Sequence, residues 1–305
     1  VYIRIFNLGN SFPSFYIFIQ SIRQMKYTVI TSLHSLVKNI PIKFFLFLSY
    51  PIAIIYYLLT PFSNFKLSKR KKFIDNYSIF KVKHNYVKYW LETIWLTKEG
   101  YFKYIYPKVN IVNEEVIRKL NKTHTSYILA LPHVGNWEFA IPMGKYLDLN
   151  LVAVAEPLQD LKILDWFTSL REQLGCKIIL GGKGQNTFDE IISLLNNNSH
   201  VCLLAERHVA KSGVGVEFFN QMAAFPKGPV ALSLETQLPV VPTAFIKSVS
   251  GYELHFGKPF IVPYFENQAQ SIQHGLKVLS KSLEELIMLD PNQWHSIQPV
   301  WTSEY

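Results

Sequence analysis

The sequence predicts an α/β fold with a mainly parallel central sheet flanked by helices, preceded by a membrane-associating helical segment. Two observations predict it. From residue 128 onward, short apolar runs alternate with amphipathic segments, which is the pattern of consecutive βαβ units. The composition is 49% hydrophobic and 15% aromatic but only 17% charged, against about 25% charged residues in average soluble proteins. Part of this apolar surface therefore needs an outlet other than a core, and a membrane is one.

The elements of the sheet follow in order along the chain. Strands are predicted at residues 128–131, 151–155, 178–180, 201–205 and 240–246. Helices are predicted between them near 138–147, 158–174, 187–195 and 228–236. Residues 252–260 resemble an added strand, and 271–289 resemble a closing helix that ends before Pro291. Since the chain has no repeat or linker, we expect residues 73–305 to form one α/β domain.

Residues 1–72 are expected to form a separate, membrane-associating helical region. The stretch Phe44–Phe62 carries no charge and is nineteen residues long, just enough to span a bilayer core as a helix. Pro51 would kink such a helix, and basic residues on both sides give no clean orientation. Three readings stay open, namely a span, a helix lying in the interface and a buried core helix. An ordinary signal peptide is not expected, because the start lacks a small-residue cleavage site.

The formal charge of +9 favours an anionic partner. The basic run Lys66–Lys72 beside the apolar stretch indicates an anionic membrane surface, where each basic residue contributes about 1 kcal/mol. No nucleic-acid partner is expected, because no signature of a nucleic-acid-binding module occurs. Cys176 and Cys202 are the two cysteines, and neither belongs to a CxxC pair. Their spacing indicates neither a disulfide framework nor a metal site.

A helix over residues 85–96 is predicted from aromatic and aliphatic side chains at helical spacing. Asn85 is its expected N-cap. Such a stripe is more often packed in a core than used to hold a cofactor. We therefore interpret it as packing against the sheet.

The residues after the first predicted strand are the strongest chemical signal. The apolar run Ile128–Leu131 ends at Pro132 and is followed by His133, Gly135 and, five positions after the histidine, Glu138. In an α/β protein, ligands bind beyond the carboxyl ends of the strands, so His133 stands where chemistry is done. A histidine there has the ordinary role of a general base.

A second predicted strand, residues 201–205, runs directly into Glu206, Arg207 and His208. If the two strands are neighbours, His133 and Glu206 face one crevice. A carboxylate bonded to one imidazole nitrogen fixes the tautomer and stabilises the imidazolium that forms when the other nitrogen takes a proton. Glu138 is the alternative partner, and we favour Glu206 slightly.

The base has no obvious protein nucleophile to activate. There is no Gly-x-Ser-x-Gly elbow and no Walker A motif. Residues Gly181–Gly184 follow a predicted strand, and either hold a phosphate at a helix N-terminus or form a tight turn. The simplest chemistry is direct attack by a hydroxyl of the substrate.

Four segments in order resemble the bacterial lipid A biosynthesis acyltransferase family, which includes late lipid A acyltransferases and phosphatidylinositol mannoside acyltransferases. The resemblance covers the chain from about residue 44 to its end. The segments are residues 88–92, residues 133–138 with the His-x-x-x-x-Glu motif, residues 206–207 followed by 214–219, and residues 225–231.

The resemblance implies transfer of a fatty acyl chain from acyl carrier protein or acyl-CoA to a glycolipid hydroxyl, at the cytoplasmic face of the cell membrane. It implies that His133 is the general base, with Glu206 or Glu138 as its partner. The acyl thioester is a co-substrate, and no cofactor or metal is implied. The substrate-binding residues implied by the same segments and by nearby basic positions are Arg171, Arg207, Phe218, Phe219 and Lys227, with both phenylalanines lining an acyl groove.

Two rival functions remain at this point. One is a lipid hydrolase that uses water in the same crevice, and the other is a non-catalytic protein that binds anionic lipid. Only an enzyme needs a base paired with a carboxylate, and only a transferase gives an acylated glycolipid rather than a free fatty acid.

Overall fold

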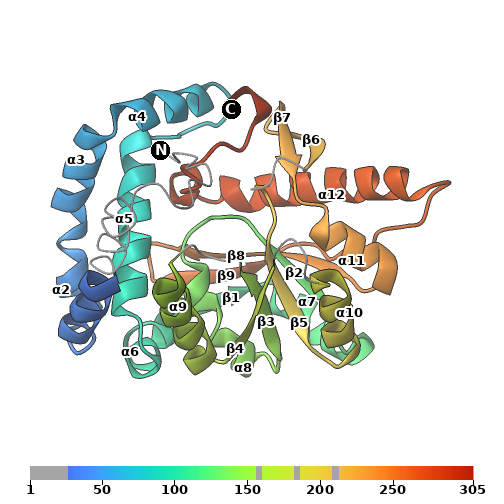
Figure 1. The fold of residues 1–305 in the computed structure, drawn as a ribbon, viewed down its shortest axis with the longest axis horizontal. Coiled ribbons are helices and arrows are strands. Elements are labelled where there is room, and N and C mark those ends of the chain that lie inside the picture. The colour runs from blue at the N-terminus through green and yellow to red at the C-terminus, as the bar shows by residue number, and fades with distance from the viewer. Residues whose placement is uncertain (1–26, 156–159, 182–185, 208–212, 305) are drawn as a thin grey trace, which may run out of the picture.

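A seven-stranded sheet is the centre of the computed structural model, which describes residues 27–155, 160–181, 186–207 and 213–304 (Figure 1). The strand order is β1-β9-β8-β2-β5-β3-β4. All neighbouring strands pair in parallel except β8 and β9, which are antiparallel, so the predicted fold class is confirmed. The strands are β1 (Val109–Val112), β2 (Ile128–Leu131), β3 (Leu151–Ala155), β4 (Cys176–Leu180), β5 (His200–Leu204), β8 (Val240–Lys247) and β9 (Tyr252–Phe256).

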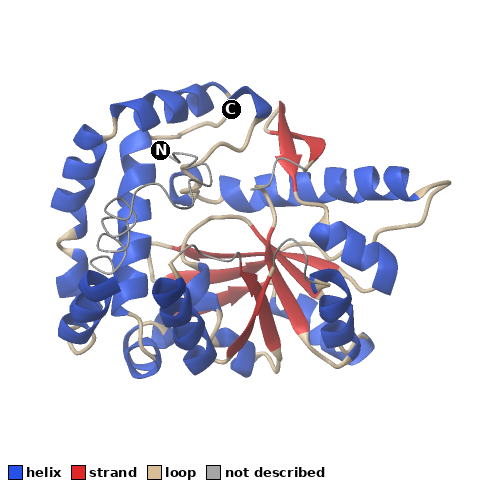
Figure 2. Ribbon diagram, in the orientation of Figure 1, coloured by secondary structure: helices blue, strands red, loops and turns tan. Residues whose placement is uncertain are grey.

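Helices cover both faces of this sheet (Figure 2). Side chains alternate between the faces along each strand, so that Ile128 and Ala130 of β2 enter one core while Leu129 and Leu131 enter the other. The first core is closed by α10 (Thr187–Asn196), α11 (Gly228–Thr236) and α12 (Gln268–Met288). The second is closed by α5 (Ile79–Trp95), α6 (Lys98–Tyr104), α7 (Glu114–Thr123), α8 (Met143–Tyr146) and α9 (Leu161–Leu174).

Most predicted elements are present, with shifted ends. The strand predicted at 178–180 begins earlier, at Cys176, and the strand predicted at 252–260 ends earlier, at Phe256. Where one helix was predicted over 138–147, the chain forms a 3-10 turn, η3 (Trp137–Ala140), and then the short α8. Pro142 separates them because it lacks the N–H that a continuous helix needs. Of the helix predicted over 158–174, residues 158 and 159 lie outside the described residues.

The prediction that Asn85 caps a helix over 85–96 is wrong. The helix α5 begins at Ile79, because the Ser78 hydroxyl accepts a hydrogen bond from Lys81 N. The side chain of Asn85, inside the helix, donates instead to the carbonyl of Asn292. The elements of the α/β domain that were not predicted include β1, the helices α6 and α7, and an antiparallel hairpin of β6 (Val214–Phe218) and β7 (Gln221–Phe225).

The N-terminal region forms α2 (Ile42–Leu46), α3 (Ser49–Leu59), α4 (Pro61–Ser68) and a 3-10 turn, η1 (Lys69–Lys72). The apolar stretch is interrupted between α2 and α3 at Phe47 and Leu48, directly before Pro51, which lacks the N–H to bond the carbonyl of Phe47 and lies in the first turn of α3. The stretch Ile42–Leu59 is long and apolar enough to cross a membrane, and only 22% of it is buried.

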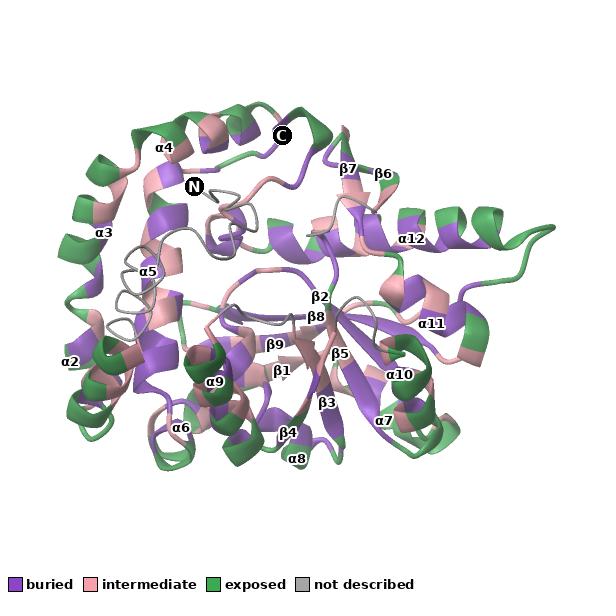
Figure 3. Ribbon diagram, in the orientation of Figure 1, coloured by how far each residue is buried: buried purple, intermediate pink, exposed green. Residues whose placement is uncertain are grey.

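The outer surface of α3 and α4 is apolar and exposed (Figure 3). Phe47 is 80% exposed and Leu59 is 76% exposed, so the reading of this stretch as a buried core helix is wrong. The opposite side of α3 packs on α5. The division of the chain into residues 1–72 and 73–305 stays a prediction.

Candidate active site

The loop after β2 is held in a fixed, unusual conformation. Gly135 has a φ of +62°, and a Cβ at this position would lie 1.9 Å from the carbonyl oxygen of Phe245. Only glycine fits such a conformation and such a close approach. The next residue, Asn136, donates its backbone N–H to that same carbonyl at 3.0 Å. The loop is therefore fastened to β8, and it presents His133 beyond the end of the sheet.

His133 and Glu206 are in direct contact. The strands β2 and β5 are neighbours, with Leu131 level with Leu204, so the residues that follow them meet. Glu206 Oε1 lies 2.7 Å from His133 Nδ1 and accepts the backbone N–H of His133 at 2.8 Å. With Nδ1 donating to the carboxylate, Nε2 keeps its lone pair and is free to take a proton.

The charge of Glu206 is maintained although the side chain is fully buried. Burial alone would raise the pKa of Glu206, but the charge of His133 and its two hydrogen bonds outweigh burial and hold the pKa below its usual value. The carboxylate therefore stays ionised beside the imidazole. It can hold the ring in one orientation and stabilise it when protonated.

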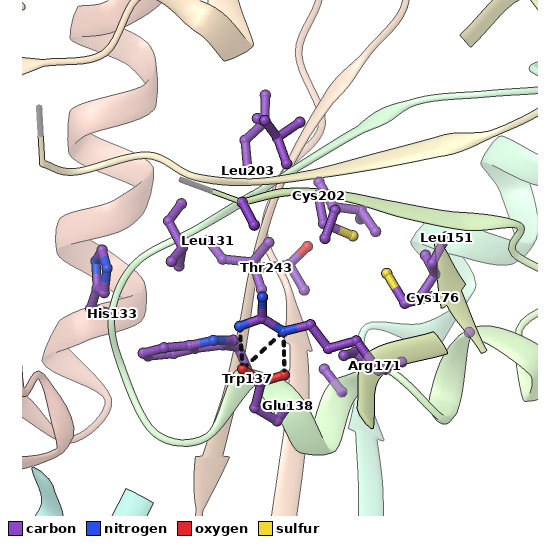
Figure 4. A pocket seen from close by; sticks show the side chains of 18 of the residues that line it. Leu131, His133, Trp137, Glu138, Leu151, Arg171, Cys176, Cys202, Leu203 and Thr243 are labelled. Carbon is purple, nitrogen blue, oxygen red and sulfur yellow. Dashed lines mark hydrogen bonds and ion pairs between the residues drawn. The ribbon is translucent and has the colours of Figure 1, made fainter. Parts of the chain in front are cut away.

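Glu138, the alternative partner, is bound elsewhere. Arg171 Nη2 donates to Glu138 Oε1 at 2.6 Å and Arg171 Nε to Oε2 at 3.0 Å, and Figure 4 shows this pair set apart from His133. Burial alone would lower the pKa of Arg171, but Glu138 raises it, so the guanidinium stays charged. The Tyr89 hydroxyl lies 3.4 Å from the same carboxylate. Glu138 thus anchors the loop to α9, and only Glu206 contacts the base.

Two residues near the C-terminus complete the surroundings of the pair, and the sequence analysis missed both. Trp294 Nε1 donates to Glu206 Oε1 at 3.2 Å. His295 donates its backbone N–H to the carbonyl of His133 at 3.1 Å, and its Nε2 lies 2.8 Å from the carbonyl of Gly135. Burial lowers the pKa of His295 to about 4, so its ring is neutral and donates from Nε2. No motif marks either residue, since their roles depend on contacts across the chain.

The loop is also supported from α5. The side chain of Asn136 caps η3 by accepting from Glu138 N, and its amide donates to Glu92 Oε2 at 2.9 Å. Burial raises the pKa of Glu92, which is buried in α5. The predicted aromatic stripe on α5 therefore has two uses. Most of it packs in the core as predicted, whereas Trp90, together with its neighbour Tyr89, lines a cavity beneath the sheet.

A cavity of about 560 Å³ lies beneath the sheet beside His133. Three rows of strand side chains line it, and they follow from the register. The first row is Leu131 and Leu204, the second is Leu129, Cys202 and Ala153, and the third is Leu151 and Cys176.

Successive rows are two residues apart, or roughly 6.6 Å, so the cavity extends roughly 13 Å from the carboxyl ends of the strands toward their amino ends. The two deeper rows include the small side chains of Ala153, Cys202 and Cys176, and their small size leaves the space that forms the cavity. Apart from the Glu138–Arg171 pair, the wall is mainly apolar. Both cysteines are protonated thiols, because burial raises the pKa of Cys176 to about 12 and that of Cys202 well above its usual value.

The other predicted substrate-binding residues are divided by the structure. Arg207 lines the cavity and donates to the side chain of Gln298. Phe218 and Phe219 do not line it, so the expectation that they form an acyl groove is not met. Lys227 is exposed before α11 and does not line the cavity, although its neighbour Pro226 does.

The reason for the position of the two phenylalanines lies in the β6–β7 hairpin. Phe219 and Asn220 both have positive φ, at 52° and 56°, and the tight turn that they make points the phenylalanines into the core. Their rings pack on Trp294 at 5.7 and 5.9 Å. Of the residues Gly181–Gly184, which were predicted to hold a phosphate or form a turn, Gly181 lines the cavity and residues 182–184 lie outside the described residues. His208 also lies outside the described residues.

The arrangement places a base next to an apolar cavity. An imidazole with one nitrogen bound to an ionised carboxylate can accept a proton from a hydroxyl. An elongated, mainly apolar cavity can hold a hydrocarbon chain. Together they suit a reaction in which an acylated substrate presents its carbonyl to the end of the cavity nearest His133.

Comparison with known proteins gives three findings. A family model described as bacterial lipid A biosynthesis acyltransferase matches residues 71–303. The chain is 26% identical over 224 residues to the phosphatidylinositol mannoside acyltransferase of Mycolicibacterium smegmatis, covering 72% of this chain and 71% of that protein. It is 30% identical over 178 residues to the enzyme of the same name from Mycobacterium tuberculosis, covering 58% of this chain and 55% of that protein.

One solved structure shows a weak likeness. It is the 1-acyl-sn-glycerophosphate acyltransferase PlsC from Thermotoga maritima, with a TM-score of 0.41 and 15% sequence identity. The likeness covers 87% of this chain and 97% of that chain. At that TM-score it says nothing about the site.

Proposed function

The chain belongs to the bacterial lipid A biosynthesis acyltransferase family and is an acyl-transferring enzyme, and we propose that it moves a fatty acyl chain from a thioester to a hydroxyl of a membrane glycolipid. The proposed donor is acyl carrier protein or acyl-CoA. The proposed acceptor is a lipid A precursor or a phosphatidylinositol mannoside, the latter because both mycobacterial relatives carry that name. Membership of an acyltransferase family favours an enzyme over a non-catalytic lipid-binding protein.

The observation that carries the proposal is the contact between His133 and Glu206 beside the 560 Å³ cavity. The acceptor hydroxyl attacks the thioester carbonyl, and His133 Nε2 takes the hydroxyl proton as the new C–O bond forms. The C–S bond then breaks, and the imidazolium returns the proton to the leaving thiolate. General base assistance of this kind contributes about 10²–10⁴ in rate.

The cavity would hold the hydrocarbon tail. The tail enters between Leu131 and Leu204 and runs beneath the sheet toward Leu151 and Cys176, so that the carbonyl stays near His133. Burial of apolar surface supplies the binding free energy, at about 25 cal/mol per Å². Arg207, which also lines the cavity, would meet an anionic group of donor or acceptor.

The exposed apolar side chains of α3 and α4 would place the enzyme at a membrane. Lys43, Lys66 and Lys69 lie over the rings of Phe44, Phe62 and Phe65, as expected where apolar rings enter a lipid interface and ammonium groups stay near the headgroups. We propose attachment at the cytoplasmic face, either peripheral or by a single span.

The test is an assay of purified protein with labelled acyl-CoA or acyl carrier protein and a panel of glycolipid acceptors. The proposal expects an acylated glycolipid that disappears with His133→Ala in a folded variant. A labelled free fatty acid in the presence of every acceptor would indicate the hydrolase instead. Unchanged transfer by folded His133→Ala would overturn the role of the base.

A further inference from the structure

Trp294 is the side chain that joins Glu206 from the side opposite His133. Its indole is fully buried, and Nε1 donates to Glu206 Oε1 at 3.2 Å. That oxygen also receives both hydrogen bonds from His133. The other oxygen, Oε2, is buried and has no hydrogen-bond partner within the described part of the chain. The hydrogen bonds that His133 and Trp294 make to this carboxylate therefore all act on Oε1.

The indole is itself held by a contact with Arg70 and by its own backbone. The Arg70 guanidinium lies 4.7 Å from the centroid of the Trp294 ring, a favourable cation–π distance. Arg70 is fixed in turn by Glu304, whose two oxygens lie 2.8 and 3.0 Å from its Nε and Nη2, and by the carbonyl of Ser296 at 2.6 Å. The backbone of Trp294 forms a β-bridge with Val134, next to the base.

We propose that Trp294 is a positioning residue for the acyl-transfer reaction, acting on His133 through Glu206. Its N–H holds Oε1 toward His133 and favours the ionised carboxylate, because a donor to a charged acceptor stabilises the charge. Without it, Oε1 keeps its two hydrogen bonds from His133 but loses the donor that fixes the carboxylate from the opposite side. This inference rests on the proposed function of His133.

Among the described residues, the charged and titratable groups that contact the indole or lie behind it are Arg70, Glu304, Tyr77 and His295. Arg70 covers one face of the indole, with Glu304 and Tyr77 behind it. His295 follows Trp294 in the chain and stays neutral above about pH 4, because burial lowers its pKa to about 4. None of these groups is removed by a change at Trp294.

The test compares Trp294→Phe with a matched control, Trp301→Phe. Trp301 is equally buried, also faces Arg70, at 5.8 Å, and donates its Nε1 to a carbonyl, that of Phe218 at 2.9 Å. Both variants lose a buried indole N–H bond and similar volume, but only the first loses a bond to Glu206. The readouts are kcat, KM and the pH profile of kcat/KM.

Trp294→Phe should lower kcat about tenfold with little change in KM, because it removes orientation rather than substrate contact. The acid limb of the profile should move upward by about half a pH unit, because a carboxylate with one donor fewer stabilises the imidazolium more strongly. Trp301→Phe should leave the limb in place and kcat within about twofold. An unmoved limb in Trp294→Phe, or an equal shift in both variants, overturns the proposal.

A measurement on chains that keep Trp294 covers the case in which Trp294→Phe does not fold. The chain has six tryptophans, so ¹⁵N-indole labelling gives six resonances. Trp301→Phe and Trp137→Phe identify the resonances of these two residues. The resonance of Trp137 must be identified because its ring lies 5.3 Å from the His133 ring and can respond to His133 directly. A further indole resonance should titrate together with His133 and lose that titration in His133→Ala.

Absence of any titrating indole other than Trp137 refutes the link to Trp294. This spectroscopic readout does not depend on turnover. A protein without transferase activity in which that further indole resonance still follows His133 would therefore remove the proposed function and keep the coupling. Transferase activity without such a resonance would do the reverse.

Discussion

Arg171 and Glu138 form a buried ion pair in the cavity wall, with Arg171 Nη2 2.6 Å from Glu138 Oε1. The motif that contains both His133 and Glu138 therefore supplies two separate parts of the site. Its histidine contacts a carboxylate from another strand, and its own carboxylate fastens the loop to α9. The two carboxylates should consequently respond differently to substitution.

Glu206→Gln should lower kcat by about 10² or more, because an amide at this position can hold the wrong imidazole tautomer. Transfer assays with the folded variant measure it, with circular dichroism as the check on folding. Full activity in this variant would mean that the contact with His133 is structural only.

Glu138→Ala should cost about 3–5 kcal/mol of unfolding free energy, because it leaves the Arg171 charge buried without its partner. Urea unfolding measures the loss. The double variant Glu138→Met with Arg171→Met should recover most of it, since an apolar pair of similar volume leaves no charge to desolvate. If the double variant has no higher free energy of unfolding than Glu138→Ala, the two charges are not coupled in this way.

Acid should destabilise the fold in part through His295. Its pKa is about 4 in the folded chain and about 6.5 when unfolded, so the unfolded state binds more protons between these values. The contribution of neutral His295 to the free energy of unfolding is on the order of 3 kcal/mol. It is fully present above pH 6.5 and is lost as the pH falls toward 4.

Unfolding titrations of the wild type and of His295→Gln at pH 4, 5, 6 and 7 measure this effect. Because His200 has the same lowered pKa and is unchanged in both proteins, it cancels in the difference. The stability gap between the two proteins should narrow toward pH 4. A constant gap across the range would contradict the assignment.

The second row of the cavity should limit acyl chain length. Ala153→Leu fills space in the middle of the lining, so the longest acyl thioester that is turned over should become shorter while short chains are still used. Competition assays with a ladder of acyl thioesters measure the profile. Val152→Leu, on the opposite face of the same strand, is the control and should leave the profile unchanged. An unaltered profile in Ala153→Leu would place the tail elsewhere.

The apolar surface of α3 should bind membranes. Leu58 and Leu59 are 69% and 76% exposed, so replacing both with Asp should abolish binding to anionic vesicles. Val249→Asp, on an exposed turn between β8 and β9, is the control. Attachment that weakens at high salt would indicate a helix in the interface, and resistance to salt and carbonate would indicate a span. A wild-type chain that ignores anionic vesicles at low salt would contradict both.

The sequence allowed prediction of those elements whose signal is local. The strand Ile128–Leu131 has the predicted ends, because an uninterrupted apolar run bounded by Pro132 defines it. The sequence alone did not establish that β2 and β5 are neighbours; the meeting of His133 and Glu206 was predicted only for the case that they are. This adjacency decides the partner of His133. In contrast, β1 is four residues long and contains Asn110, so its pattern is too short to stand out.

The remaining parts of the site depend on contacts between distant segments. The bond from Trp294 to Glu206 joins residues 88 positions apart, and no local pattern reports it. The position of Phe218 and Phe219 could not be predicted either, since a hairpin with two residues at positive φ turns them inward. Asn85 resembled an N-cap only because the Ser78 cap lies before the aromatic stripe begins.

The wide separation of its parts has a kinetic consequence for this site. His133 and Glu206 are 73 positions apart, and Arg70 and Glu304 are 234 apart. Loops of this length must close before the site exists, and a parallel sheet with such long-range pairing folds slowly. The exposed apolar surface of α3 is local and can form at once, well before the sheet is complete. Refolding without lipid or detergent should therefore lose material to aggregation at this surface, and an early membrane encounter would protect the chain while its catalytic parts assemble.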